Sequence, residues 1–363
     1  MPGHTEDKRT YQKTGSDRKK AAEMESIQAF AYEMGKNGAK IWRCFSRDTR
    51  AVVPERIGEW NVAEIMPYAF SAHMDEAEFR KGLAQGKIKM FYPPKLGETA
   101  DTLPALCGNR LEEMILSDGI SRIGRYCFYN CENLNHISFT DRVRDWGSGA
   151  FTGCHRVGHI EIEMEQGEAS TLKDVLAELR EELYVDYKVK GQDSLGREAV
   201  QHARLYFPEY YEEGVENTPA RILETHVHGS GLYYRNCFQQ RVFQFQEYDS
   251  RFAYAQAQEG DDFLAHMVAA RLRFPYKLSE EAKHRYEAYV TEQKWKFADL
   301  VISERNLSSM EWLMKTVGEQ TEELADYMIV LAGKNSYPEG MSWLMDFKRR
   351  TFGAAKRRHR MEL

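Results

Sequence analysis

Hydrophobic and polar positions recur with one fixed period between Leu111 and Cys154. Residues 111–131 and 134–154 align without a gap at a spacing of 23 residues, and a third unit begins at Val157. The equivalent positions carry the predicted core residues Leu111 and Leu134, Met114 and Ile137, Ile120 and Val143, Ile123 and Trp146, Phe128 and Phe151, and Cys131 and Cys154. Such a period is typical of a solenoid, whose coils bury their hydrophobic faces against each other. The pattern predicts Met114 over Ile137 and Phe128 over Phe151.

The residues before these repeats predict a further unit and a cap. Val62, Ile65 and Phe70 occur 58 residues before their equivalents in the first clean repeat, and residues 71–110 form an insertion between the two. The insertion contains a predicted helix over 74–85. Two short runs, 30–34 and 39–45, flank a Gly/Asn turn and predict a β-hairpin. The hairpin would cover the hydrophobic face that the first coil leaves open.

The pattern changes after Ile162. Apolar residues at helical spacing predict an amphipathic helix over 170–183, and local alternation predicts a strand over 184–190. Residues 198–278 are rich in aromatic side chains, which we interpret as helices joined by tight loops. Two helices are predicted with clear ends: residues 261–272, which stop before Pro275, and residues 279–290, which begin with a serine cap and early glutamates.

A second repeat occupies the C-terminal part. Met310-Glu-Trp-Leu-Met314 recurs as Met341-Ser-Trp-Leu-Met345 at a spacing of 31 residues, and a further helical segment precedes each copy. This spacing predicts ankyrin-like helical hairpins, although the Thr-Pro-Leu-His motif of ankyrin repeats is absent. The predicted fold class is therefore α+β, with a short solenoid capped by a hairpin and followed by a mainly α-helical part. The predicted segments are 1–25 (disordered), 26–190 (repeats with the insertion), 195–278 (aromatic-rich and helical), 279–352 (helical hairpins) and 353–363 (basic tail).

The repeats resemble a known family. The motif Ile-x-x-Ile-Gly-x-x-Cys-Phe-x-x-Cys-x-x-Leu over 120–134 and its partner Val-x-x-Trp-Gly-x-x-Ala-Phe-x-x-Cys over 143–154 resemble the BspA-like leucine-rich repeats. The resemblance covers about residues 30–162 and implies a bacterial protein with a solenoid used for protein binding, often at the cell surface. Two features depart from that picture. The array is short, and Trp146 stands where the family has isoleucine.

Composition narrows the class of partner. The 363 residues carry a net charge of −6, which argues against a general nucleic-acid binder. Only the basic tail, including 348–350 and 356–360, favours such contact, and a charged helix end is the simpler interpretation. The chain has no apolar run long enough to span a membrane and no apolar signal region at its start, so we expect a cytoplasmic protein without a membrane anchor. The six cysteines are then expected to be reduced.

Two clusters carry candidate chemistry. His226 and His228 lie two residues apart, so on a strand they would share a face and offer two ligands to a metal ion, with Glu224 and Ser230 nearby. No third metal ligand is evident, and the alternative is a strand that enters a glycine turn. Gly229-Ser-Gly231 would also suit an anion. Cys127, Cys131, Cys154 and His155 superficially resemble a zinc set, but their repeat positions favour a buried ladder.

Two classes of function follow from this sequence. The first is an intracellular interaction or scaffold protein that binds an unidentified protein partner through the repeats and the helical hairpins. The second is an enzyme or ligand-binding domain at 195–275, with the repeats as a targeting arm. Because nucleophile and phosphate-loop motifs are absent from the sequence, we favour the first class and assign no catalytic residue, cofactor or metal ion. The oligomeric state is not predicted.

Overall fold

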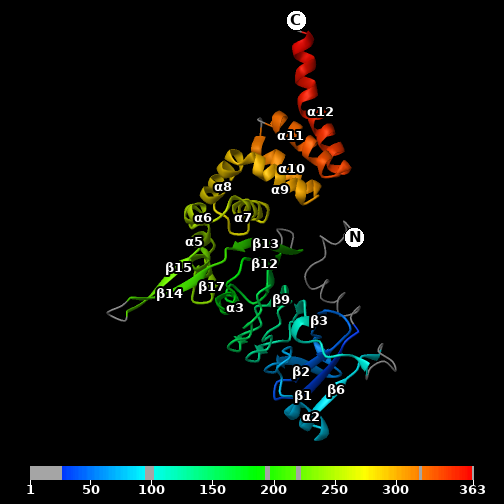
Figure 1. Cartoon of the computed structure of the whole chain (residues 1–363). Helices are drawn as coiled ribbons and strands as arrows, with labels where there is room; N and C mark the ends of the chain where they lie inside the picture. Colours follow the sequence, from blue (N-terminus) through cyan, green and yellow to red (C-terminus); the bar gives the residue numbers. More distant parts are fainter. Residues whose placement is uncertain (1–26, 95–101, 193–196, 218–221, 319–320, 362–363) are drawn as a thin grey trace. The chain divides into compact units, whose positions relative to one another are not determined.

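The chain is a mixed α+β protein that divides into two compact units, residues 1–244 and 245–363. The computed structural model describes residues 27–94, 102–192, 197–217, 222–318 and 321–361 (Figure 1). The predicted disordered segment 1–25 lies outside the described residues. Among the described residues, none of the helices combines the length and the apolar character that a membrane crossing requires.

Two sheets form the repeat region of the first unit (Figure 1). One sheet has the order β13-β12-β11-β9-β7-β3, with β3 (Arg50–Val52), β7 (Glu113–Ile115), β9 (His136–Thr140), β11 (His159–Met164), β12 (Leu183–Gln192) and β13 (Glu198–Phe207). The other has the order β10-β8-β5-β2-β1-β6, with β1 (Ala29–Met34), β2 (Ala39–Phe45), β5 (Trp60–Ile65), β6 (Ile88–Phe91), β8 (Arg122–Ile123) and β10 (Asp145–Trp146); β4 (Arg56–Ile57) pairs with β5. The coils with β3 and β5, β7 and β8, and β9 and β10 therefore each contribute a strand to both sheets.

The predicted stacking of the coils is confirmed. Met114 pairs in register with Ile137, and Ile137 with Ile160, because β7, β9 and β11 are parallel at the repeat spacing. The row continues to Val185 and Leu205, and every member is fully buried. Three aromatic rings stack in the same way, Phe70 on Phe128 at 5.7 Å and Phe128 on Phe151 at 5.5 Å between ring centroids. Each ring covers its neighbour, so the coils stabilise one another.

The N-terminal cap is a hairpin, as predicted. β1 and β2 are antiparallel, and β2 continues the sheet by pairing in parallel with β5. The insertion adds α2 (Glu76–Ala84), whose first turn is capped by the Asp75 side chain, and β6, which pairs with β1. Trp42, Phe79 and Ile88 form a small core between the hairpin and the insertion. The sequence pattern did not predict β6, because Ile88-Lys-Met-Phe91 is too short to show a clear alternation.

A close approach of backbones explains the equivalent glycines of the two central repeats. A Cβ atom on Gly147 would lie 2.2 Å from the backbone nitrogen of Arg125, and one on Gly124 would lie 2.3 Å from the nitrogen of Pro67. Real Cβ contacts with backbone atoms do not occur at these distances, so the coils must separate to admit a side chain. In the first repeat Met66 occupies the matching position. It is tolerated there because the strand before β5 in the sheet is β2 of the hairpin, whereas β8 and β10 each follow a strand of an earlier coil.

Replacing Gly147 by alanine should therefore loosen the array. We expect a loss of about 1–3 kcal/mol in the free energy of unfolding, the usual range for an overpacked site. Gly158→Ala is the matched control, because a Cβ there would meet only the carbonyl oxygen of Arg156 at 3.9 Å. Urea unfolding monitored by circular dichroism would measure both variants. Equal midpoints for the two would show that the coils are not held at this distance.

The structure corrects two predictions for the segment after the repeats. The helix predicted over 170–183 is limited to α3 (Leu172–Glu178), because Leu183 belongs to β12 and pairs with Phe207. The helices predicted between 198 and 228 are wrong. These residues form β13 and a separate antiparallel pair, β14 (Tyr211–Asn217) and β15 (Ile222–His228), which lie side by side in Figure 1. The ten-residue pairing of β12 with β13 outweighs local helical preference.

The last elements of the first unit are short. α4 (Gly231–Arg235) precedes the two-stranded pair β16 (Phe238–Gln239) and β17 (Val242–Phe243). Arg235 is buried and donates to the carbonyl oxygens of Leu179 at 2.8 Å and Glu181 at 2.7 Å, and to those of Pro208 and Gly231. Its guanidinium therefore fixes α4 against the chain that leads into β12.

Helices dominate the described residues of the second unit. It contains α5 (Phe245–Ser250), α6 (Phe252–Gln258), α7 (Asp261–Arg273), α8 (Glu280–Glu292), α9 (Lys294–Ser303), α10 (Leu307–Val317), α11 (Thr321–Lys334) and α12 (Pro338–Met361). The helices predicted over 261–272 and 279–290 are confirmed, and the side chain of Ser279 caps α8 by accepting from the nitrogen of Ala282. The ankyrin-like type of the later hairpins stays a prediction. The backbone of the predicted basic tail continues α12 to Met361.

Candidate functional site on the polar face of the repeat sheet

The first sheet has one apolar side and one polar side. The apolar side carries the buried row that includes Met114 and Ile137. The opposite side, which we call the polar face, includes two long rows of in-register neighbours. These rows are Arg50, Glu113, His136, His159, Tyr184 and Tyr206, and Val52, Ile115, Ser138, Glu161, Asp186 and Arg204. The strand alternation that buries the hydrophobic residues thus places the polar residues together on the other side.

Stacked rings follow the first row. His136 lies on His159 with ring centroids 4.3 Å apart, and His159 lies on Tyr184 at 4.4 Å. Tyr184 continues the stack to Tyr206 at 5.4 Å. Nε2 of His136 is buried and has no hydrogen-bond partner among the described residues. These four residues, called the ring row below, come from four adjacent strands.

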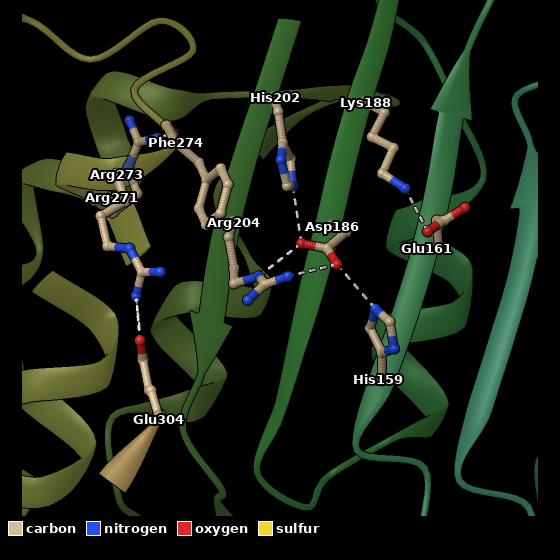
Figure 2. A network of polar contacts seen from close by, with 10 residues as sticks. All are labelled: His159, Glu161, Asp186, Lys188, His202, Arg204, Arg271, Arg273, Phe274 and Glu304. Atoms are coloured by element: carbon tan, nitrogen blue, oxygen red, sulfur yellow. Dashed lines mark hydrogen bonds and ion pairs between the residues drawn. The ribbon is translucent and has the colours of Figure 1, made fainter. Parts of the chain in front are cut away.

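Asp186 is the centre of the second row. Its side chain is 6% exposed and accepts four hydrogen bonds: from Nε2 of His159 at 3.0 Å, from Nε2 of His202 at 2.8 Å, and from Nε and Nη2 of Arg204 at 2.7 and 3.0 Å. Figure 2 shows the carboxylate between His159 on one neighbouring strand and His202 and Arg204 on the other. Arg204 also covers the Tyr184 ring at 5.0 Å. The two rows are therefore joined at His159 and Tyr184.

The surroundings shift the acidity of these groups. Burial alone would raise the pKa of Asp186, but the hydrogen bonds from His159, His202 and Arg204 outweigh it and hold that pKa well below its usual range. Burial lowers the pKa of His159 against the opposing effect of Asp186. The neighbouring His136 lowers the pKa of Glu113. Near neutral pH the Asp186 carboxylate is thus ionised and the His159 ring is uncharged.

The remaining charges of the face are paired with each other. Lys188 contacts Glu161, and Lys190 contacts Glu163 at 3.2 Å as well as Glu165 (Figure 2 shows the Lys188 pair). These pairs join β12 to β11 and its following turn. At the β3 end of the face, in contrast, Arg50 and Glu113 are 47% and 40% exposed and their charged atoms lie 3.9 Å apart. This end is therefore the more accessible part of the polar face.

The predicted histidine cluster is placed on a strand. His226 and His228 lie on one face of β15, and Nε2 of His228 lies 3.1 Å from a carboxylate oxygen of Glu213 on β14. The His228 ring also stacks on Tyr211 at 4.5 Å. Ser230 is buried just before α4, and the Glu224 side chain lies outside the described residues. Within the described residues, no group of three His, Cys, Asp or Glu side chains is arranged to hold a metal ion. A site at these four residues stays a prediction.

The cysteine ladder is confirmed. Sγ of Cys131 donates to the carbonyl oxygen of Phe70 at 3.2 Å, and Sγ of Cys154 to that of Phe128 at 3.0 Å, so each thiol bonds to an earlier coil. Both cysteines and Cys127 are buried and free. Burial raises the pKa of the Cys154 thiol to about 12, which keeps it protonated. His155 is exposed and contacts Glu181 instead.

The predicted repeat core is buried almost without exception. Eleven of the twelve predicted residues are at most 2% exposed, and Trp146 is half-buried with its Nε1 donating to Oγ1 of Thr171 at 2.9 Å. Sequence reasoning missed the polar face. A signal was present, because Glu113, His136 and His159 are themselves separated by the repeat period of 23 residues. The strand register then brings them together.

A comparison with known families agrees with this geometry. Residues 104–172 match the family described as BspA type leucine rich repeat region (6 copies). The match covers the coils that carry β7, β9 and β11, and it is a repeat family, not an enzyme family. No curated protein and no solved structure matches the chain. Leucine-rich repeats generally mediate protein–protein interaction.

Proposed function

We propose that this chain is a protein-interaction or scaffold protein, in which a short solenoid of leucine-rich repeats presents the β3 end of its polar face to a protein partner. The observation that carries the proposal is the polar face itself, where in-register residues of successive coils form one continuous surface. The helical hairpins of the second unit would supply a further surface. The match of residues 104–172 to a leucine-rich repeat family supports binding as the activity.

The accessible end of the face defines the partner's chemistry. Arg50 and Glu113 are exposed side by side, and the buried Nε2 of His136 lies next along the row. A partner segment that offers an acidic and a basic side chain at matching spacing would exchange the 3.9 Å pair between Arg50 and Glu113 for two intermolecular pairs. Such rim charges contribute more to specificity and association rate than to raw affinity.

A charge swap tests this proposal. The double variant Arg50→Glu/Glu113→Arg keeps the net charge and the pair, but inverts the pattern that a partner meets. We expect a stoichiometric protein captured from native lysate by the full chain to be lost or reduced at least tenfold with this variant, measured by quantitative mass spectrometry.

The matched control is a second exposed pair on the other sheet. Arg122 and Asp145 are 63% and 53% exposed, with charged atoms 3.0 Å apart, so Arg122→Asp/Asp145→Arg makes the same change away from the polar face. The control should retain the partner. Loss of the partner in both variants, or in neither, would contradict a binding surface at the β3 end.

A further inference from the structure

We propose that His136 and His159 form a proton-sensitive pair within the polar face, so that acidification from about pH 7 to pH 5 charges the pair and breaks the ring row. One consequence of this inference, the control of the binding surface by pH, rests on the proposed function. The switch itself is a property of the chain alone. Histidine is the side chain whose ordinary titration falls in this range.

The stacked geometry favours two uncharged rings. The imidazoles of His136 and His159 lie nearly parallel, 12° apart in plane, at a centroid distance of 4.3 Å. Two neutral rings pack well in this arrangement, whereas two imidazolium cations at that distance repel each other inside a half-buried site. The pair therefore takes up its first proton more readily than its second, and the two titrations are coupled.

A hydrogen bond to Asp186 fixes the position of the His159 ring. Its Nε2 lies 3.0 Å from Oδ2 of Asp186, so we assign the proton of the neutral ring to Nε2. Asp186 already accepts two hydrogen bonds from the permanently charged Arg204 and one from His202. A proton added to His159 thus joins a site where Arg204 already matches the charge of the buried Asp186 carboxylate and Lys188 that of the buried Glu161.

The groups that face the pair come from every neighbouring strand. Glu113 on β7 lies 3.9 Å from Nδ1 of His136, Glu161 lies on β11 with His159, and Tyr184 and Asp186 lie on β12. His202, Arg204 and Tyr206 follow on β13. Asp186 and Glu161 favour the charged form of His159. Burial, Arg204 and the mutual repulsion of the rings oppose the charged forms.

The sign of the pH effect follows from His159. Its folded-state pKa is lowered, mainly by burial, below the ordinary value near 6.5. The unfolded chain therefore binds this proton first as the pH falls, and the stability that the neutral ring provides is complete above the ordinary pKa and declines below it. The lowered pKa of Asp186 acts in the same direction, but only below about pH 4.

The experiment is a pH titration of the full chain labelled with ¹⁵N in histidine, followed by nuclear magnetic resonance from pH 8 to pH 5. We expect His136 and His159 to titrate in two separate steps, with the His159 midpoint below that of free histidine, and the Tyr184 ring signals to shift in the same interval. In His136→Phe the stack is kept but one charge is removed, so the His159 midpoint should rise. The exposed His284 on α8 provides the control variant His284→Phe, which should leave the His159 midpoint unchanged.

Two results would overturn the switch. One is a single midpoint near that of free histidine for both rings, and the other is a His159 midpoint unaffected by His136→Phe. Far-ultraviolet circular dichroism over the same range separates the switch from general unfolding. Unfolding of the chain at the first protonation step would also contradict the switch. Failure of the charge-swap experiment leaves these outcomes intact, so the proposed function and the switch fail independently.

Discussion

Replacing Phe128 by alanine is expected to destabilise the repeat unit by about 3–5 kcal/mol, the range measured for buried phenylalanines. Phe128 is fully buried and is the middle ring of the stack that joins three coils, at 5.7 Å from Phe70 and 5.5 Å from Phe151. Truncation removes its contacts on both sides and leaves a cavity that rigid coils cannot close. The loss should therefore exceed that for a terminal ring of the same stack.

Urea unfolding followed by circular dichroism would measure this loss. Phe151→Ala, at one end of the ring stack, should cost less than Phe128→Ala. The control Trp60→Ala removes a larger ring that is 53% exposed, and it should change the free energy of unfolding by less than about 1 kcal/mol. If Phe128→Ala unfolds at the same urea concentration as the Trp60 variant, the stack does not hold the coils together.

Much of the repeat region could be predicted, because its hydrophobic positions recur with a fixed period along the chain. Met114 and Ile137 lie in register since each coil repeats the one before it, so a spacing in sequence becomes a distance in space. β13 and β14 were not predictable by the same reasoning. They pair with β12 and β15, the strands next to them in the chain, but they repeat no pattern of the coils. The aromatic composition of this region suits helices and strands equally well.

In the candidate site, too, the residues that repeat along the chain could be predicted and those brought in by strand pairing could not. Glu113, His136 and His159 repeat at the period of the core, so the sequence itself indicates that they share one face of the sheet. His202 and Arg204 could not be predicted in this way, because they reach Asp186 only through the antiparallel pairing of β13 with β12. Local patterns reveal what a coil repeats, but they do not reveal which later strand extends the sheet.

A second large effect is expected in the helical unit, where Asp249→Asn should cost about 3–5 kcal/mol in the free energy of unfolding. Asp249 and Arg271 are 2% and 0% exposed, and the carboxylate accepts from Nε and Nη2 of Arg271 at 2.8 and 2.9 Å. Tyr286 donates its hydroxyl to the same carboxylate at 3.0 Å. The asparagine retains the shape but leaves the guanidinium buried without a counter-charge.

The geometry of this pair explains why one charge matters for the whole unit. Asp249 lies on α5, Arg271 on α7 and Tyr286 on α8, so three helices meet at one carboxylate. Burial opposes the charge of Arg271, yet the hydrogen bonds and charge of Asp249 outweigh it and raise the pKa of Arg271. The cation therefore persists in the asparagine variant, since arginine does not lose its proton at accessible pH.

Three variants separate the loss of charge balance from the loss of contacts. Asp346→Asn removes an acid of α12 that is 42% exposed and paired with Arg349 and Arg350, so it should change stability by about 1 kcal/mol or less. Asp249→Leu/Arg271→Met removes both buried charges, and it should recover much of the stability lost in Asp249→Asn, because apolar replacement of a whole buried pair is often nearly neutral. Thermal unfolding followed by calorimetry would rank the three. If the double variant is less stable than Asp249→Asn, the pair stabilises the unit through its hydrogen-bond geometry as well as through its balance of charge.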